Sequence, residues 1–198
     1  MRRLASSMAL LRRSRHRSTV AVGMSGGVDS AVAALLLQQQ GHDVVGVHMS
    51  NWDSSEDGLG HDCNERDRKD AERVCQQLGI GFHEVSFQRE YWHEVFTPFL
   101  KGYQDGGTPN PDLSCNRHIK FGHFAEHARQ LGADHVATGH YARLRRANGD
   151  GRVQLLAAAD ATKDQSYFLA AVRQVMALAP HSALRRASPG AQRGARRG

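Results

Sequence analysis

The sequence has no long apolar run and few cysteines. No stretch of its 198 residues approaches the ~18–20 consecutive apolar residues of a membrane-spanning helix, so we expect no membrane partner. Three cysteines are too few for the disulfide framework of a small secreted scaffold. None of them belongs to a C-x-x-C pair, which argues against a structural zinc site or an iron–sulfur cluster. Apolar residues make up 40% of the chain, enough for the core of one domain.

Acidic residues are absent from both ends of the chain. Residues 1–20 and 170–198 each contain six arginines and no Asp or Glu, so the net charge of +6 conceals a middle segment, 21–169, with a net charge of −6. The first end is rich in Arg and Ser, which is typical of an organellar transit peptide. We expect residues 1–19 to direct the chain to the mitochondrial matrix; a disordered or nucleic-acid-binding arm is the alternative. Residues 170–198 have no apolar period and predict a disordered tail.

Apolar strands alternate with amphipathic helices between the two basic ends. The expected strands are residues 19–24, 43–49, 81–87 and 133–138. The expected helices are residues 29–40, 65–78, 90–103 with a kink at Pro98, and one from the turn at 106–112 to Leu131. Residues 50–64 are expected to form a long loop. This alternation predicts an α/β fold, a doubly wound, mostly parallel, Rossmann-like sheet.

A glycine-rich segment lies between the first expected strand and the first expected helix. Residues 23–30 have the sequence Gly-Met-Ser-Gly-Gly-Val-Asp-Ser. Gly26 and Gly27 let backbone amides approach an anion, and the helix N-terminus adds partial positive charge. Asp29 could hold Mg²⁺ against phosphates. The segment lacks the lysine of a Walker A loop and the spacing of G-x-G-x-x-G. We expect it to bind nucleotide phosphates; a glycine turn without ligand is the alternative.

Cys115 follows Asn-Pro-Asp at residues 110–112, near the start of an expected helix. Asp112 is expected to cap that helix. A thiol in the first helical turn has a lowered pKa because the helix dipole stabilises its thiolate. Three basic residues nearby favour the thiolate further: Arg117, His118 and Lys120. A reactive cysteine is therefore predicted, with a buried structural cysteine as the alternative. Cys75, on the apolar face of its helix, is expected in the core.

Five segments together resemble the tRNA-specific 2-thiouridylases, a family of PP-loop ATP pyrophosphatases. They are residues 23–30, Thr-Pro-Asn-Pro-Asp-Leu-Ser-Cys-Asn at 108–116, Ile-Lys-Phe at 119–121, Ala-Thr-Gly-His-Tyr at 137–141 and Lys-Asp-Gln-Ser-Tyr-Phe-Leu at 163–169. The resemblance covers residues 20–169, the expected catalytic domain. The glycine-rich segment is common to PP-loop enzymes, whereas Asn-Pro-Asp-x-x-Cys and Lys-Asp-Gln-Ser-Tyr-Phe-Leu are more specific. A PP-loop amide synthetase is the enzymatic alternative, and it leaves Asn-Pro-Asp-x-x-Cys unexplained.

The resemblance implies ATP-dependent transfer of sulfur to the wobble uridine of tRNA. ATP, with Mg²⁺, would adenylate the 2-oxygen of the uridine, and a cysteine persulfide would then deliver the sulfur. A sulfur-relay protein or a cysteine desulfurase would be the donor. The resemblance also implies a disulfide bond.

The resemblance assigns roles to individual residues. Cys115 matches the nucleophile, and Asp112 is placed to act as an acid or base. The nucleotide contacts match Gly23, Met24, Ser25, Gly26, Gly27, Val28, Asp29, Ser30, Met49 and Gly139. The target-base contacts match Asn110, Pro111 and Asp112, and a tRNA contact matches Lys163, Asp164 and Gln165.

The sequence departs from the family's pattern after Leu169. The family has a second cysteine downstream, which carries the persulfide, and then a central domain and a C-terminal β-barrel. No cysteine follows Cys115, and residues 170–198 do not resemble those domains. We therefore expect the chain to bind ATP and to form little or no 2-thiouridine alone. A non-catalytic ATP-binding fragment or isoform is the alternative.

Overall fold

A computed structural model describes residues 17–52, 61–146 and 152–173. The predicted transit peptide and tail therefore lie almost wholly outside the described residues. Within these three ranges, none of the helices combines the length and the apolar composition that crossing a bilayer requires.

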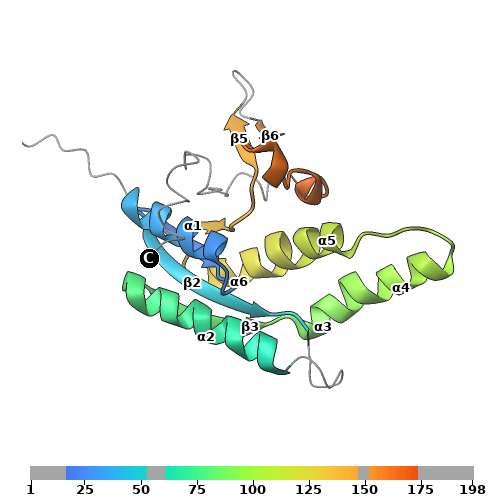
Figure 1. The fold of residues 1–198 in the computed structure, drawn as a ribbon, viewed down its shortest axis with the longest axis horizontal. Coiled ribbons are helices and arrows are strands. Elements are labelled where there is room, and N and C mark those ends of the chain that lie inside the picture. The colour runs from blue at the N-terminus through green and yellow to red at the C-terminus, as the bar shows by residue number, and fades with distance from the viewer. Residues whose placement is uncertain (1–16, 53–60, 147–151, 174–198) are drawn as a thin grey trace, which may run out of the picture.

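A parallel sheet of four strands forms the centre of the described structure (Figure 1). The strand order is β3-β2-β1-β4, and every neighbouring pair is parallel. The strands are β1 (Thr19–Gly23), β2 (Asp43–Ser50), β3 (Gly81–Ser86) and β4 (His135–Ala137). All four were predicted, each within a few residues of its observed ends.

Helices cover both faces of this sheet, which confirms the doubly wound α/β fold. On one face, α1 (Val28–Gln39) and α2 (His61–Leu78) pack Leu37, Ala71 and Cys75 against Val20 and Val22 of β1. On the other face, an apolar cluster joins Ala21 of β1 and Val47 of β2 to later helices. Alternate residues of β1 thus serve opposite faces, as the two-residue period of a strand requires.

The second helix begins earlier than predicted. Helix α2 starts at His61, so the expected loop 50–64 ends there and its residues 53–60 lie outside the described part. The prediction began at Glu65 because the buried residues of this helix, Ala71 and Cys75, stand in its second half. A polar first half gives no apolar period to detect.

The helices before and after the turn at 106–112 each contain a π-helical stretch. The first runs through α3 (Gln88–Tyr91), the π-helix η1 (Trp92–Phe96) and α4 (Thr97–Gln104). The N–H of Thr97 bonds to the carbonyl of Trp92, five residues back, and Pro98 stands at the start of α4. The wide turn therefore precedes Pro98, where the sequence predicted a kink. The second run comprises α5 (Pro111–Ser114), the π-helix η2 (Cys115–His123) and α6 (Phe124–Gln130).

An antiparallel hairpin, which the sequence analysis did not predict, follows the sheet. Its strands are β5 (Arg143–Arg146) and β6 (Val153–Leu156), and they form a separate two-stranded sheet. Figure 1 shows this hairpin standing apart from the central sheet. Two single turns of 3₁₀-helix come next, η3 (Ala161–Lys163) and η4 (Tyr167–Leu169).

Candidate functional site

The candidate site lies where β1, β2 and β4 end. From β1 the chain continues to β2 and β3 on one side, and returns to β4 on the other. The strand order therefore reverses between β1 and β4, which is where open α/β sheets bind ligands. Gly23, Met49 and Gly139 lie at or just beyond the ends of three neighbouring strands.

The glycine-rich loop forms a closed turn at the start of α1. Gly26 has a φ of +78°, and a Cβ there would lie 2.5 Å from the carbonyl oxygen of Asp67, so only glycine fits. The hydroxyl of the buried Ser30 donates to the carbonyl of Gly27 at 2.9 Å and accepts from the amide of Ser25 at 3.2 Å. Gly27 is the N-cap and has no side chain to accept from the first amides of α1. Those amides suit a phosphate.

Asp29 is the acidic residue of the first turn of α1. The hydroxyl of Tyr141 donates to its Oδ1 at 2.7 Å, across 112 residues of sequence. Among the described residues, no group of three or more His, Cys, Asp or Glu could hold a metal ion. A single carboxylate still fits Mg²⁺, because this ion keeps several waters and is bound through one or two carboxylates together with substrate phosphates.

Gly139 contacts the start of α1 at very short range. A Cβ on Gly139 would lie 2.9 Å from both the carbonyl carbon of Asp29 and the amide nitrogen of Ser30. On the other side of the loop, a Cβ on Gly23 would lie 3.0 Å from the Cε of Met49. The structure therefore brings together the residues predicted to contact the nucleotide.

The helix that carries Cys115 is capped differently from the prediction. Asn110 is the N-cap, and its Oδ1 accepts from the amide of Asp112 at 2.9 Å, so the predicted cap at Asp112 is wrong. Pro111 takes the first helical position, where its missing N–H costs nothing, and this leaves the preceding residue as cap. Cys115 consequently lies beyond the first turn, within which the helix dipole acts.

The predicted lowering of the thiol pKa is also wrong. Burial raises the pKa of Cys115; the positive charge of Lys120 opposes this effect, and the negative charge of Asp112 adds to it. Lys120 is five residues after Cys115, and in the π-helix η2 residues five apart lie on nearly the same side. The thiol is therefore mainly protonated at neutral pH, with an ammonium group placed to stabilise its thiolate.

His140 connects the thiol region to the end of β4. Its Nδ1 lies 2.7 Å from Oγ1 of Thr138. Burial, with a smaller effect of the charge of Lys120, lowers the pKa of His140 to about 4. His140 is therefore neutral at physiological pH. The ring of His140 lies 6.1 Å from the ring of Phe121 in η2, the π-helix that begins at Cys115.

The predicted tRNA-contacting segment closes onto Tyr141. The side-chain Oε1 of Gln165 accepts from the backbone N–H of Tyr141 at 3.0 Å. The backbone N–H of Gln165 donates to the backbone carbonyl of Tyr141 at 2.9 Å. Asp164 accepts from the amide of Ala158 at 2.8 Å, and this bond, with those from Ser166, lowers the pKa of Asp164. Asp164 and Gln165 thus hold the segment in place, while Lys163 is exposed.

Three residues of the site were not predicted: Tyr141, His140 and Asn116. Buried Asn116 of η2 donates through Nδ2 to the backbone carbonyl of Phe168 of η4 at 2.8 Å. This hydrogen bond joins the two helical segments. Its Oδ1 has no hydrogen-bond partner among the described residues. All three belong to motifs noted in the sequence. The partners of Tyr141 and Asn116 are distant in the chain, so no local pattern could reveal their roles. His140 bonds to nearby Thr138, but its burial comes from the tertiary fold.

The cysteines differ in environment. Cys75 is fully buried, as predicted, and burial raises its pKa to about 11. Both Cys75 and Cys115 are free thiols. The side chain of Cys63 lies outside the described residues.

Comparison with known proteins identifies the family of this chain. A family model described as tRNA methyl transferase HUP domain matches residues 18–180. The chain belongs to this family. Two curated relatives, from Shouchella clausii and Alkaliphilus oremlandii, are each 55% identical to this HUP domain chain, over 160 and 155 residues. Both are named tRNA-specific 2-thiouridylase MnmA, which confirms the resemblance noted in the sequence.

The matches cover most of this chain and less than half of each relative. The aligned part is 81% of this chain and 43% of the Shouchella clausii protein, so the chain spans about two fifths of that relative's length. Among solved structures, a predicted subunit of tRNA methyltransferase from Methanocaldococcus jannaschii is similar, with a TM-score of 0.45 and 16% identity. That similarity covers 89% of this chain and 73% of the other.

Proposed function

We propose that this HUP domain takes part in ATP-dependent replacement of the 2-oxygen of the wobble uridine of tRNA by sulfur. The observation that carries the proposal is the pairing of two separately predicted features. Cys115 and Met49 pack against one apolar cluster, and Met49 approaches Gly23 of the glycine-rich loop. The nucleophilic thiol thus packs against the same apolar cluster as Met49, the residue that approaches the start of the phosphate-binding loop. The names of the 55%-identical relatives support the same reaction.

The loop would hold ATP and Mg²⁺. The uncapped amides at the start of α1 suit the phosphates, Asp29 would hold Mg²⁺, and Met49 and Gly139 would lie beside the adenosine. When bound, ATP would supply the adenylyl group that makes the 2-oxygen a leaving group. The hydrogen bond from Tyr141 would fix the Asp29 carboxylate in one orientation.

Cys115 would act as the nucleophile after losing its proton. Because burial keeps the pKa of this thiol raised, a proton acceptor is needed, and Asp112 is the carboxylate whose charge acts on it. Lys120 would then stabilise the thiolate. Asn110, Pro111 and Asp112 would contact the target base, and Lys163, Asp164 and Gln165 the tRNA. The sulfur would arrive as a cysteine persulfide, from a sulfur-relay protein or a cysteine desulfurase.

The place of action that we propose is the mitochondrial matrix. The Arg- and Ser-rich composition of residues 1–19, without acidic residues, supports this. Fusion of this segment to a fluorescent protein should give a mitochondrial signal, and diffuse cytosolic fluorescence would contradict the proposal.

The reaction is tested with the purified full chain, ATP, Mg²⁺, a persulfide donor and an unmodified tRNA transcript. We expect tRNA-dependent release of pyrophosphate as the 2-oxygen is adenylated. Release of AMP and formation of 2-thiouridine, followed by mass spectrometry, should both be much lower, because AMP leaves only when sulfur displaces it and no cysteine follows Cys115. Cys115→Ser should abolish any 2-thiouridine. Release of AMP that does not depend on tRNA would refute the proposal. An amide synthetase, the alternative, would keep its activity in Cys115→Ser.

A further inference from the structure

The hairpin of β5 and β6 concentrates positive charge on a domain that is otherwise acidic. Strand β5 contains Arg143, Arg145 and Arg146, and Arg152 immediately precedes β6. We call these two strands and Arg152 the arginine hairpin. Residues 21–169 as a whole carry a net charge of −6, so the basic character of the hairpin is local. A local cluster of arginines is the electrostatic signature of a surface that binds phosphates.

Core packing does not account for the hairpin. Neither apolar cluster of the described residues includes one of its side chains, and Leu155 is 37% exposed. A two-stranded hairpin on its own is marginally stable in water. Its base is instead tied down by polar bonds: Nε of Arg143 donates to the carbonyl of Ala157 at 2.7 Å. The residues that follow are fixed by Asp164, which accepts from the amide of Ala158.

Arg145 is held in one orientation by a neutral group. Oε1 of Gln154, its partner across the hairpin, accepts from Nε at 3.1 Å and from Nη2 at 2.8 Å. An amide orients the guanidinium without cancelling its charge, and a guanidinium has five N–H donors, so three remain. An oriented guanidinium suits the two oxygens of a phosphate. Arg143 stands on the same face of β5, because side chains two residues apart share a face.

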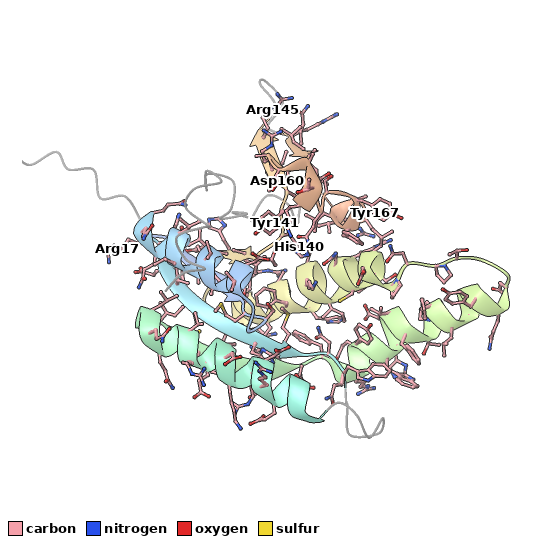
Figure 2. The ribbon with its side chains drawn as sticks, viewed as in Figure 1. Arg17, His140, Tyr141, Arg145, Asp160 and Tyr167 are labelled. Carbon is pink, nitrogen blue, oxygen red and sulfur yellow. The ribbon has the colours of Figure 1, made fainter. Side chains whose placement is uncertain are left out.

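The hairpin is fixed relative to the candidate site. Tyr141, two residues before β5, pairs with Gln165 through its backbone and bonds to Asp29 of the glycine-rich loop through its hydroxyl. Figure 2 shows Arg145 at the outer part of the hairpin, with Tyr141 and His140 near its base. A long polyanion whose reactive part enters the site could therefore run along the hairpin.

We propose that the arginine hairpin binds the phosphate backbone of the RNA whose uridine occupies the candidate site. This proposal rests on the proposed function and adds a contact surface outside the segments assigned above. Arg143 and Arg145 carry the contact. The acidic remainder of the domain repels RNA, so a basic projection beside the site both attracts the backbone and sets its direction.

The test measures binding of an unmodified tRNA transcript to the full chain by fluorescence anisotropy, from about 50 to about 200 mM salt. In Arg143→Gln/Arg145→Gln we expect a Kd for tRNA at least about tenfold higher than that of the wild type. The slope of log Kd against log salt concentration should fall by about one for each lost phosphate contact. Arg66→Gln/Arg73→Gln is the matched control: it removes the same charge from the exposed face of α2. The control should bind within about twofold of the wild type.

Three outcomes would overturn the proposal. Unchanged affinity and salt slope in the hairpin variant, with tRNA bound by the wild type, would refute the hairpin contact and leave the proposed function standing. An equal loss in the α2 control would show that net charge alone attracts the RNA. Absence of tRNA binding by the wild type would refute the proposed function as well. Folding of each variant is checked by its ATP-induced thermal shift, and Arg143→Lys/Arg145→Lys, which keeps the charge, should retain the wild-type salt slope.

Discussion

Replacing Gly139 by alanine should separate the end of β4 from the start of α1. The new methyl carbon would lie 2.9 Å from the carbonyl carbon of Asp29 and from the amide nitrogen of Ser30. Both are backbone atoms, which no side-chain rotation can move aside. Overpacking of this kind costs about 1–3 kcal/mol, and the lower entropy of the unfolded alanine chain offsets about 0.4–1 kcal/mol of it. We expect a net loss of about 1–2 kcal/mol in the free energy of unfolding.

Gly81→Ala provides the matched control. A Cβ at Gly81, the first residue of β3, would meet only the Cγ2 of Val45 at 3.6 Å, an ordinary contact. The same chemical change there should leave stability unchanged or raise it by up to about 1 kcal/mol. The difference between the two variants therefore isolates the contact made by Gly139.

Urea denaturation, with and without ATP, measures both consequences of Gly139→Ala. Without ATP the urea midpoint of Gly139→Ala should fall below that of the wild type, while the midpoint of Gly81→Ala should equal or exceed it. With ATP, Gly139→Ala should gain less stability than the wild type, because the displaced amides are those proposed to hold the phosphates. If both variants show the same stability and the same response to ATP, the close approach of Gly139 to α1 is not what shapes this loop.

Three further substitutions test individual contacts. Tyr141→Phe removes the hydrogen bond to Asp29 and should lower the free energy of unfolding, measured by urea denaturation, by about 1 kcal/mol. An unchanged urea midpoint would contradict a stabilising role of this bond. Lys120→Met removes the charge that favours the Cys115 thiolate, so the pH midpoint of iodoacetamide alkylation at Cys115 should rise. The folded-state pKa of His140, about 4, is below the unfolded value of 6.5, so the stability it contributes is present above pH 6.5 and is lost as pH falls toward 4. His140→Asn should reduce that acid sensitivity in thermal melts, and an identical pH profile would speak against it.

The sequence was sufficient for the features that depend on local pattern. Apolar runs such as 19–24 and 43–49 located the strands because a buried parallel strand needs continuous apolar residues. The glycine-rich loop was found because strand, glycines and helix follow one another directly. The residues predicted to contact the nucleotide lie together for the same reason: the strands that carry them all end at one edge of the sheet.

Features that depend on distant contacts or fine geometry escaped prediction. The arginine hairpin was missed because charged and apolar residues do not alternate regularly along β5 and β6. Asn110 and Asp112 are both good capping residues, and the position of Pro111 decided between them. The pKa of Cys115 was predicted in the wrong direction because its burial comes from the tertiary fold, which the helix position alone cannot indicate.

The wide turn of η2 makes this part of the chain intolerant to changes of length. A π-helical stretch contains one residue more than the α-helix it interrupts, and that residue sets the rotation of α5 relative to α6. Removing a single residue between Cys115 and Phe124 would turn α5 by about 100° about the helix axis, while the buried Phe124 and Ala128 held α6 in place. Point substitutions here adjust the chemistry, whereas a one-codon deletion would aim the thiol in another direction.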